Sequence, residues 1–232
     1  MREFDSRISL QMQGNFEIMA LHYDKEVRIF KVSRMGPIDN NGYIIVSPTT
    51  NDAVIVDAPE EPEKLLYDLK ISGANVNAIV ITHSHNDHVA GIEILRSKLG
   101  VPVWAHISDA GDISIVDEVF EGDDNMDIGD INMKVIHTPG HTPGSTCYLV
   151  DGHLFSGDTL FPGGPGFTAT PDDLRQEITS ICSKLFVISR ETNIYPGHGQ
   201  DVTVGQANDE YAIFSSKSHS TTLCGNVSWL TS

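Results

Sequence analysis

Histidine and aspartate gather in a few short segments of this chain of 232 residues. The residues concerned are His83, His85, Asp87, His88, His141, Asp158 and His198. Imidazole and carboxylate ligands without thiolate suit zinc, iron or manganese, and geometry and availability select among these metals. Side chains two apart in an extended backbone project to the same side, so His83 and His85 can bind one ion, while Asp87 and His88, where the backbone turns into a helix, point towards another. The spacing predicts two divalent cations, with Zn²⁺ as the first choice and iron or manganese as alternatives.

Short apolar runs come before each of these segments and predict the strands that position them. Residues 76–81 form a continuous apolar run, which is typical of a strand buried on both faces. The runs before the other three segments are residues 131–136, 153–155 and 193–195, the last strand expected along the chain. Ligands of open α/β sheets bind beyond the carboxyl ends of strands, so we expect the four segments to converge on one rim of the fold.

An antiparallel meander is predicted ahead of the histidine-rich loop. Its strands are short and rich in β-branched residues, at positions 27–32, 43–46 and 54–56. Turn-forming clusters separate them, namely Gly36-Pro37, Asn40-Asn41-Gly42 and Asn51-Asp52. Two further strands are predicted at residues 101–105 and 146–150, and the turn dipeptide Asp151-Gly152 joins the second of these to the strand after it.

Three helices are predicted between the strands. They cover residues 59–72, residues 89–99 and a stretch that opens at Thr170. Gly100 stops the second, and Thr170 is an N-cap that Pro171 follows. The tail at residues 215–232 is polar and predicts no element. No internal repeat or low-complexity linker divides the chain, so residues 1–232 are expected to form one domain.

Four ordered segments resemble the signature of the metallo-β-lactamase superfamily, and most of all its glyoxalase II-like branch. They are the His-x-His-x-Asp-His loop at residues 83–88, Thr138-Pro139-Gly140-His141-Thr142-Pro143-Gly144-Ser145, Phe155-Ser156-Gly157-Asp158-Thr159-Leu160-Phe161 and Pro196-Gly197-His198-Gly199. The resemblance implies an α/β fold, the αββα sandwich, in which two mixed β-sheets lie back to back with helices on the outer faces.

The resemblance also implies a role for each candidate residue. The implied ligands are His83, His85 and His141 for the first metal, Asp87, His88 and His198 for the second, and Asp158 for the bridge between them. Asp57 matches an aspartate that steadies the loop of metal ligands. Asp57 is equally suited to cap the helix that follows it, so both interpretations stay open.

The chemistry expected of two such cations is hydrolysis. They would lower the pKa of a shared water from about 15.7 towards neutrality, so that a metal-bridging hydroxide attacks a carbonyl carbon. A thiolate, with a parent thiol pKa of about 8.5, then departs near neutral pH with little help, whereas an amine or alkoxide needs a proton donor. No acid outside the ligand set is evident, although Asp87 or a metal-bound water could donate. The prediction is a hydrolase of a thioester or activated ester, as in glyoxalase II, with Asp87 and Asp158 as catalytic carboxylates.

Alternatives of other classes remain. A lactonase would use the same chemistry, and a non-catalytic metal-binding scaffold would bind metal without turnover. Mono-iron persulfide dioxygenases share the ligand order, but they have a Gly-Arg-Thr-Asp segment where this chain has Gly166-Phe167-Thr168-Ala169. Glutathione as a carrier is in doubt, because glyoxalase II binds it through a basic C-terminal region, whereas Lys217 is the sole Lys or Arg after His198 here.

The charge balance limits the partners. Asp and Glu total 32 against 15 Lys and Arg, a formal net charge of -17, and such a surface repels phosphate backbones and anionic lipids at long range. We therefore expect a small-molecule substrate, and neither nucleic acid nor membrane as a partner. Three cysteines without a Cys-x-x-Cys pair indicate no disulfide framework, and residues 1–26 contain no sustained apolar stretch. A cytoplasmic location is expected, and the oligomeric state is not predicted.

Overall fold

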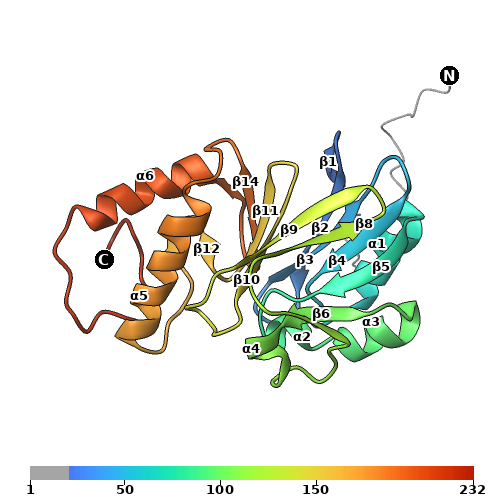
Figure 1. Ribbon diagram of the computed structural model, residues 1–232, viewed down its shortest axis with the longest axis horizontal. Coiled ribbons are helices and arrows are strands. Elements are labelled where there is room, and N and C mark those ends of the chain that lie inside the picture. The colour runs from blue at the N-terminus through green and yellow to red at the C-terminus, as the bar shows by residue number, and fades with distance from the viewer. Residues whose placement is uncertain (1–20) are drawn as a thin grey trace.

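The computed structural model describes residues 21–232 of the chain. Two β-sheets lie face to face and helices cover the outer face of each, so the layers run helix, sheet, sheet, helix (Figure 1). This arrangement confirms the expected αββα sandwich of two mixed sheets. Most of residues 1–26, for which the sequence predicts no apolar leader, lies outside the described residues.

The first sheet has seven strands that follow one another in chain order. They are β1 (Leu21–Asp24), β2 (Arg28–Met35), β3 (Asn40–Val46), β4 (Asp52–Val56), β5 (Asn75–Val80), β6 (Val103–His106) and β7 (Glu118–Phe120). Neighbours are antiparallel from β1 to β4 and parallel from β4 to β7. The predicted meander is confirmed in β2, β3 and β4, whereas the short and partly polar β1 and β7 are additions to the prediction.

The second sheet has six strands in the order β15-β14-β11-β10-β9-β8. They are β8 (Asp124–Ile128), β9 (Ile131–His137), β10 (Thr146–Val150), β11 (His153–Gly157), β14 (Asn193–Pro196) and β15 (Val202–Thr203). β14 runs parallel to β11, and the other neighbours are antiparallel. The prediction that residues 193–195 form the last strand is wrong, because β15 follows and pairs with β14. A small hairpin of β12 (Leu160–Phe161) and β13 (Gly164–Pro165) forms a separate two-stranded sheet.

The helices differ from the predictions mainly at their ends. They are α1 (Glu63–Ser72), α2 (Asn86–Val89), α3 (Ile92–Leu99), α4 (Ile107–Ala110), α5 (Pro171–Ser180) and α6 (Val204–Ser215), with a π-helical turn η1 (Ile181–Leu185) directly after α5. α1 begins at Glu63 rather than at Pro59. The helix predicted to open at Thr170 is confirmed, because the side chains of Thr170 and Asp173 cap each other's backbone reciprocally.

The single helix predicted over residues 89–99 is wrong, because the chain breaks it into α2 and α3. The break lies at Gly91, whose N–H donates to the carbonyl oxygen of Ala58 at 2.8 Å. A Cβ atom at this position would lie 2.3 Å from the carbonyl oxygen of Pro59, so glycine alone fits the close approach. The N–H of Ala58 donates in turn to the carbonyl oxygen of His88 at 2.8 Å. The break therefore holds the end of α2 against the loop that follows β4.

β3 begins three residues earlier than predicted. Asn40-Asn41-Gly42 has the composition of a turn, but the structure places it inside β3 and buries it. The N–H of Asn41 donates to the carbonyl oxygen of Gly197 at 2.7 Å, and its side-chain amide donates to the carbonyl oxygens of Pro196 at 3.0 Å and Gly199 at 3.1 Å. These bonds attach the first sheet to the loop after β14 in the second. The partners lie far away in the sequence, which is why local composition misses them.

Three apolar clusters lie between the four layers. One packs α1 to α3 on the first sheet, another fills the space between the sheets, and the third packs α5 and α6 on the second sheet. β3 contributes to two of them: Ile44 and Val46 face the first cluster, and Tyr43 and Ile45 face the second. β5 is fully buried only in its second half, so the expected burial on both faces is confirmed there and wrong at its start.

The tail after α6 packs back between α5 and α6 (Figure 1). Trp229 is fully buried in the third cluster, and its backbone N–H donates to the carbonyl oxygen of Gly163 at 2.8 Å. Thr168 and Gly225 exchange two backbone hydrogen bonds, at 3.3 and 2.8 Å. The tail therefore supports the loop that leads from the β12–β13 hairpin to α5, a role that its polar composition does not indicate.

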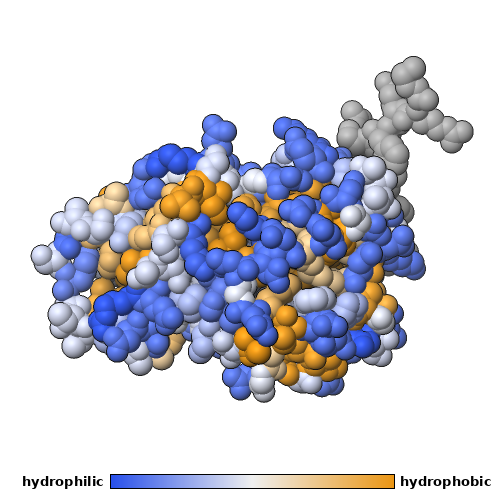
Figure 2. Space-filling model, in the orientation of Figure 1, coloured by the Kyte–Doolittle hydropathy of each residue, from blue (hydrophilic) through white to orange (hydrophobic). Residues whose placement is uncertain are grey.

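Figure 2 shows a mostly hydrophilic face, in keeping with the net charge, with hydrophobic residues gathered over the region of α3 and α4. Among residues 21–232, none of the helices has the length and apolar character needed to cross a membrane. Cys147, Cys182 and Cys224 are all free, which confirms that the cysteines form no disulfide framework.

Candidate metal centre

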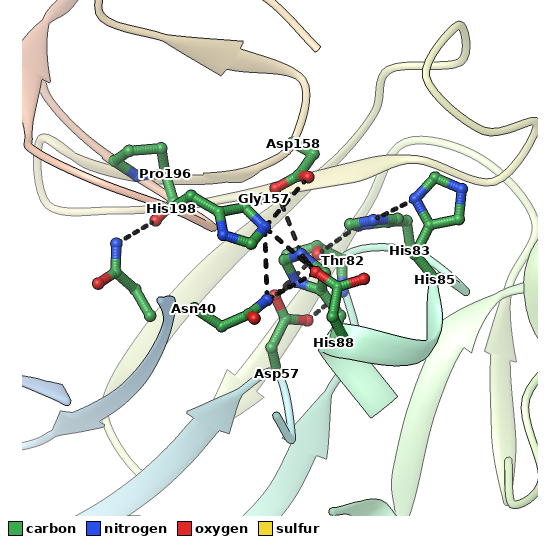
Figure 3. A network of polar contacts seen from close by, with 12 residues as sticks. Asn40, Asp57, Thr82, His83, His85, His88, Gly157, Asp158, Pro196 and His198 are labelled. Atoms are coloured by element: carbon green, nitrogen blue, oxygen red, sulfur yellow. Dashed lines mark hydrogen bonds and ion pairs between the residues drawn. The ribbon is translucent and has the colours of Figure 1, made fainter. Parts of the chain in front are cut away.

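The structure brings all seven candidate ligands to one end of the sandwich, part of which Figure 3 shows from close by. The loop after β5 and the one-turn helix α2 supply His83, His85, Asp87 and His88. The loops after β9, β11 and β14 supply His141, Asp158 and His198. Segments from both sheets thus converge beyond the carboxyl ends of strands, as the sequence pattern predicts.

His83, His85 and His141 form a first cluster. Nε2 of His141 lies 3.2 Å from Nε2 of His83 and 2.9 Å from Nδ1 of His85, and those two atoms are 3.1 Å apart. Nδ1 of His141 donates to the carbonyl oxygen of Phe167 at 2.8 Å. The hydroxyl of Thr82 donates its proton to the carboxylate of Asp57 at 2.9 Å. The same hydroxyl lies 3.0 Å from Nδ1 of His83, so it accepts a hydrogen bond from that nitrogen. In the neutral rings both Nε2 atoms are therefore acceptors, and two acceptors facing each other with no proton between them suit a cation.

Asp87, His88 and His198 form a second cluster. Oδ2 of Asp87 lies 3.3 Å from Nε2 of His88 and 3.1 Å from Nε2 of His198. Nδ1 of His198 donates to the carbonyl oxygen of Ile38 at 3.1 Å, which leaves Nε2 to face the carboxylate. The three ligand atoms lie within 4.8 Å of one another, close enough to share one ion.

Asp158 lies between the two clusters and contacts both. Its Oδ1 is 3.3 Å from Nε2 of His88, and its Oδ2 is 3.5 Å from Nε2 of His198 and 3.8 Å from Nε2 of His141. Gly197 leaves room for it, because a Cβ atom there would lie 2.3 Å from Oδ1 of Asp158 and 2.4 Å from Cε1 of His88. Asp158 thus occupies the position that a bridging ligand would need.

Asp57 lies behind His88 rather than at the start of a helix. Its Oδ2 is 2.8 Å from Nδ1 of His88, and the carboxylate also accepts from the N–H of Thr82 at 2.8 Å and from the hydroxyl of Thr82 at 2.9 Å. When Nδ1 of His88 donates to Asp57, the neutral ring presents Nε2 to the second cluster. α1 has Pro62 before its first turn and no side-chain cap, so capping by Asp57 is the interpretation that fails.

The first cluster favours neutral rings before any metal binds. Burial lowers the pKa of His83 well below its usual value, and the nearby charge of His88 adds to this effect. Burial likewise lowers the pKa of His141. Neutral imidazole is the form that binds a metal, so these two rings are ready to act as ligands.

The second cluster holds protons before a metal binds. Burial disfavours the charged form of His88, but Asp158 and Asp57 outweigh burial and raise the pKa of His88 well above its usual value. Burial also lowers the pKa of His198, but hydrogen bonds to Asp158 and Asp87 outweigh burial and raise this pKa to about 9. Burial alone would raise the pKa of both carboxylates in the cluster, but the histidines hold the pKa of Asp87 and that of Asp158 far below the usual range.

The residues present fit a pair of divalent cations. Nε2 of His88 and Oδ1 of Asp158 are buried 3.3 Å apart, but neither forms a hydrogen bond of good geometry, and an unsatisfied buried polar atom costs about 1–3 kcal/mol. A cation between them would satisfy both atoms. Five imidazoles and two carboxylates without thiolate form a donor set for zinc, iron or manganese. His85 is exposed, so the site opens to solvent on its side.

Asn40 is a buried site residue that the sequence pattern does not single out. Its side-chain amide donates to Oδ2 of Asp87 at 2.7 Å and lies 3.4 Å from Nε2 of His198. Asn40 also forms a backbone bridge with His198 across the two sheets. The amide therefore orients a carboxylate of the second cluster, although its own position resembles a turn in the sequence.

Asp109 is a second buried residue that sequence patterns miss. It accepts from the N–H of Ser84 at 2.8 Å, from the hydroxyl of Thr142 at 2.7 Å and from the N–H of Gly144 at 2.7 Å. One carboxylate thus ties the loop that carries His83 and His85 to the loop that carries the third ligand of that cluster. Its one signal in the sequence is its place just after a strand of the parallel part of the first sheet.

Comparison with protein families matches residues 35–202 to the metallo-beta-lactamase superfamily, a range that includes every residue of both clusters. The chain belongs to this superfamily. The resemblance seen in the sequence is thereby confirmed, and the metallo-beta-lactamase fold implies that the protein binds divalent metal.

Two relatives illustrate the range of the superfamily around this chain. A protein of Bacillus subtilis named probable metallo-hydrolase YqgX is 32% identical over 197 residues, which cover 76% of this chain and 92% of the relative. The cytoplasmic hydroxyacylglutathione hydrolase of Arabidopsis thaliana is 32% identical over 169 residues, which cover 69% of this chain and only 64% of that enzyme. The family and these relatives show a metallo-hydrolase, and the chain is shorter than the full hydroxyacylglutathione hydrolases it resembles.

Solved structures of the superfamily share the fold. The crystal structure of the BLEG-1 B3 metallo-beta-lactamase superposes with a TM-score of 0.72 at 28% identity, covering 78% of this chain and 96% of that one. ETHE1 from Myxococcus xanthus gives a TM-score of 0.68 at 25% identity over 87% of this chain and 86% of its own. The protein TTHA1623, solved in a di-iron-bound form, gives 0.65 at 31% identity over 76% of this chain and 96% of its own.

Proposed function

We propose that the seven side chains hold two divalent cations and that the protein hydrolyses a thioester or an activated ester. His83, His85 and His141 bind the first cation; Asp87, His88 and His198 bind the second; Asp158 binds both. The observation that carries the proposal is the meeting of three imidazole nitrogens within 2.9–3.2 Å of one another, while Nδ1 of His83 and of His141 is hydrogen-bonded on the far side of its ring.

The remaining chemistry belongs to the chain's own side chains. When bound, a pair of cations supplies Lewis acidity, which activates water near neutral pH and polarises a carbonyl oxygen. The histidines lower the pKa of Asp87 and that of Asp158 before a metal binds, and carboxylates that bind a cation are ionised, so both are suited to accept a proton rather than to donate one. Asn40 keeps Oδ2 of Asp87 directed at the site through its amide.

A leaving group that departs without a proton suits this set of side chains. A thiol has a pKa of about 8.5, so a thiolate can leave near neutral pH with little help. An alkoxide, by contrast, needs an acid that protonates it as it leaves. An ionised Asp87 cannot donate, which leaves a metal-bound water as the remaining donor that the sequence allows. The relatives named hydroxyacylglutathione hydrolases support thioester cleavage, although this chain spans about two thirds of their length. Zn²⁺ is the proposed metal, with iron or manganese as alternatives.

We further propose that residues 1–232 form one domain in the cytoplasm that acts on a small molecule. The apolar cluster shared by both sheets supports a single domain, because neither sheet could be separated without exposing it. The net charge of -17 argues against nucleic acid and anionic membranes as partners.

Metal analysis together with an activity screen tests the proposal. The purified protein is loaded with Zn²⁺ and assayed against a thioester, an aryl ester, a lactone, a phosphodiester and a β-lactam, and its metal content is measured by mass spectrometry. Two zinc ions per chain with fastest turnover of the thioester or aryl ester are expected. Asp158→Ala is the variant at the site, and Asp209→Ala, on the exposed face of α6, is its matched control.

Other outcomes distinguish the alternatives. For the protein as purified, before zinc is added, one iron per chain with oxygen uptake when a persulfide is supplied would identify a dioxygenase. In the zinc-loaded panel, fastest turnover of the lactone would identify a lactonase. Two metals without turnover of any substrate in the panel would indicate a metal-holding scaffold. Each of these results contradicts thioester or ester hydrolysis as the main activity.

A further inference from the structure

Three large apolar side chains stand beside the two clusters. Ile38 is 56% exposed and Phe167 is 51% exposed, while Phe161 is partly buried. The carbonyl oxygen of Ile38 accepts from His198 at 3.1 Å, and that of Phe167 accepts from His141 at 2.8 Å. The ring centroid of Phe161 lies 6.4 Å from that of His198. The backbone of Ile38 and of Phe167 and the ring of Phe161 therefore lie beside the two halves of the site, and the side chains of Ile38 and Phe167 are exposed there.

The position of Phe167 is fixed by the fold. Its loop is held on one side by the backbone bond from Trp229 to Gly163 at 2.8 Å and on the other by the paired bonds between Thr168 and Gly225. Thr168 is buried directly beside the exposed phenylalanine. Because the backbone is anchored on both sides of it, Phe167 remains at the surface next to His141 instead of folding into the core.

The surroundings offer apolar contact and disfavour negative charge. Single exposed apolar side chains are ordinary on a protein surface, but several around one site are typical of a ligand pocket, in which a few polar groups are set in an apolar wall. The exposed Asp39 directly follows Ile38 in the chain, and the net charge of the whole chain is -17. A carboxylate at the far end of an acyl chain would lose its hydration against this apolar wall and, beyond the two cations, would meet this negative field.

We propose that Ile38, Phe161 and Phe167 form an apolar subsite for the acyl group of the substrate, which is an uncharged hydrocarbon or aromatic group. This inference rests on the proposed hydrolysis of a thioester or ester. A carbonyl carbon held between the clusters places the next carbons of its acyl chain beside these three side chains. Each methylene buried against them should raise kcat/KM about threefold to fourfold.

A series of thioesters on one small, uncharged carrier tests the subsite. Acetyl, propionyl, pentanoyl and glutaryl thioesters of N-acetylcysteamine are compared, since glutaryl matches pentanoyl in length and adds a carboxylate. We expect kcat/KM to rise at least about tenfold from acetyl to pentanoyl and to fall again for glutaryl. A series that is flat in chain length, or one in which glutaryl is preferred, would overturn the subsite.

Variants locate the preference in the structure. Phe167→Ala and Ile38→Ala should each reduce the ratio of pentanoyl to acetyl kcat/KM by about threefold to tenfold, and Phe167→Leu should keep most of it. Ile71→Ala is the matched control, because Ile71 is 52% exposed on α1, on the outer face of the first sheet. Metal content and Tm are measured for each variant. An unchanged ratio in both alanine variants, with normal metal content, would overturn the assignment.

Binding of stable analogues separates this inference from the proposed reaction. Ketones in which a methylene replaces the thioester sulfur cannot be hydrolysed, and their affinity is measured by calorimetry with the metal-loaded protein. Affinity that rises with acyl length without turnover of any ester or thioester would support the subsite and overturn the proposed hydrolysis. Turnover of thioesters together with affinities that ignore acyl length would leave the hydrolysis standing and overturn the subsite.

Discussion

Nδ1 of His88 lies 2.8 Å from Oδ2 of Asp57, and both residues are buried. The contact joins the end of β4 to the helix α2 and sets which nitrogen of His88 faces the second cluster. The backbone of Asp57 has a φ of 63°, a left-handed conformation that aspartate and asparagine adopt more readily than most residues. The residue behind the ligand is thus placed by both its side chain and its backbone.

Asp57→Asn should weaken the second cluster and spare the first. Asparagine tolerates the left-handed backbone, but it has one acceptor oxygen for the hydrogen bonds from both His88 and Thr82. Its NH₂ group would face a donor of one of these two residues, which leaves both donors without an acceptor. Loss of such a supporting carboxylate lowers metal affinity by about 10–100-fold. Competition with a chelator should show one of the two sites weakened within that range. Two unchanged affinities, matching those of Asp209→Asn, would contradict the role given to Asp57.

Asp158→Ala should abolish the paired arrangement and most of the activity. The shared carboxylate offsets the repulsion between two dications, so its loss leaves them without screening at close range. Mass spectrometry should show metal content falling from two ions per chain to one or fewer. Two metals and normal turnover in this variant would show that Asp158 does not bridge the clusters.

The two clusters should take up metal in order, and the second should depend on pH. The pKa of His83 and that of His141 are lowered, so a metal meets neutral rings in the first cluster. The pKa of His88 is raised well above its usual value and that of His198 to about 9, so a metal must displace protons from the second. Affinity at the second cluster therefore rises with pH at least up to about pH 9, and it depends on pH more steeply than affinity at the first cluster.

Calorimetric titration with Zn²⁺ in buffers of different ionisation enthalpy measures this difference. The first equivalent should bind near pH 6 with less proton release than the second, and the second should bind above about pH 8 and release protons. Equal proton release by the two equivalents at every pH would contradict the assignment of the protons to the second cluster.

Glu177 should make the protein less stable as pH rises. It is fully buried against Gly140, its Oε1 accepts from the N–H of Gly166 at 3.2 Å, and its Oε2 has no hydrogen-bond partner. Burial raises the pKa of Glu177 from 4.5 to about 9, so the folded protein keeps a proton that the unfolded chain releases. Between those two pH values the folded state binds more protons than the unfolded state, so the free energy of unfolding falls as pH increases.

Glu177→Gln removes this dependence while keeping an acceptor for Gly166. The variant should be more stable than the wild type by on the order of 4 kcal/mol near pH 8, or about ten degrees in Tm, and by less than about 1 kcal/mol near pH 5. Thermal melts of the two metal-free proteins at both pH values measure the difference. A gap in Tm that is the same at pH 5 and pH 8 would show that Glu177 is not the group responsible.

The ligand loops could be predicted because their signals are local. His83 to His88 are contiguous, and His141 and His198 each follow a Pro-Gly pair directly after an apolar run. Most of the strands and helices followed from the alternation of apolar runs and helical patterns, with errors confined mostly to the ends of elements, whereas the arrangement of the layers followed from the resemblance to the superfamily. Gly91 is the exception, because the backbone that approaches it lies elsewhere in the fold.

Apart from Asp57, the supporting residues could not be predicted, because their partners lie far away in the sequence. Asn40 looks like a turn residue until His198 is seen beside it, and Asp109 looks like a surface residue of a short helix until two loops are seen to donate to it. Trp229 ends a polar tail whose apolar partners belong to α5 and α6. Composition within a short window carries no information on such contacts.

The far nitrogens of the site histidines have a consequence for how an ion enters. Nδ1 of His83, His88, His141 and His198 is each occupied by a hydroxyl, a carboxylate or a carbonyl oxygen. The rings are therefore aimed before the ion arrives, and no rotamer search delays its capture. Entry is then paced by how readily the ion gives up its hydration water, so Mg²⁺, which dehydrates reluctantly and prefers oxygen, competes poorly even where it is far more abundant.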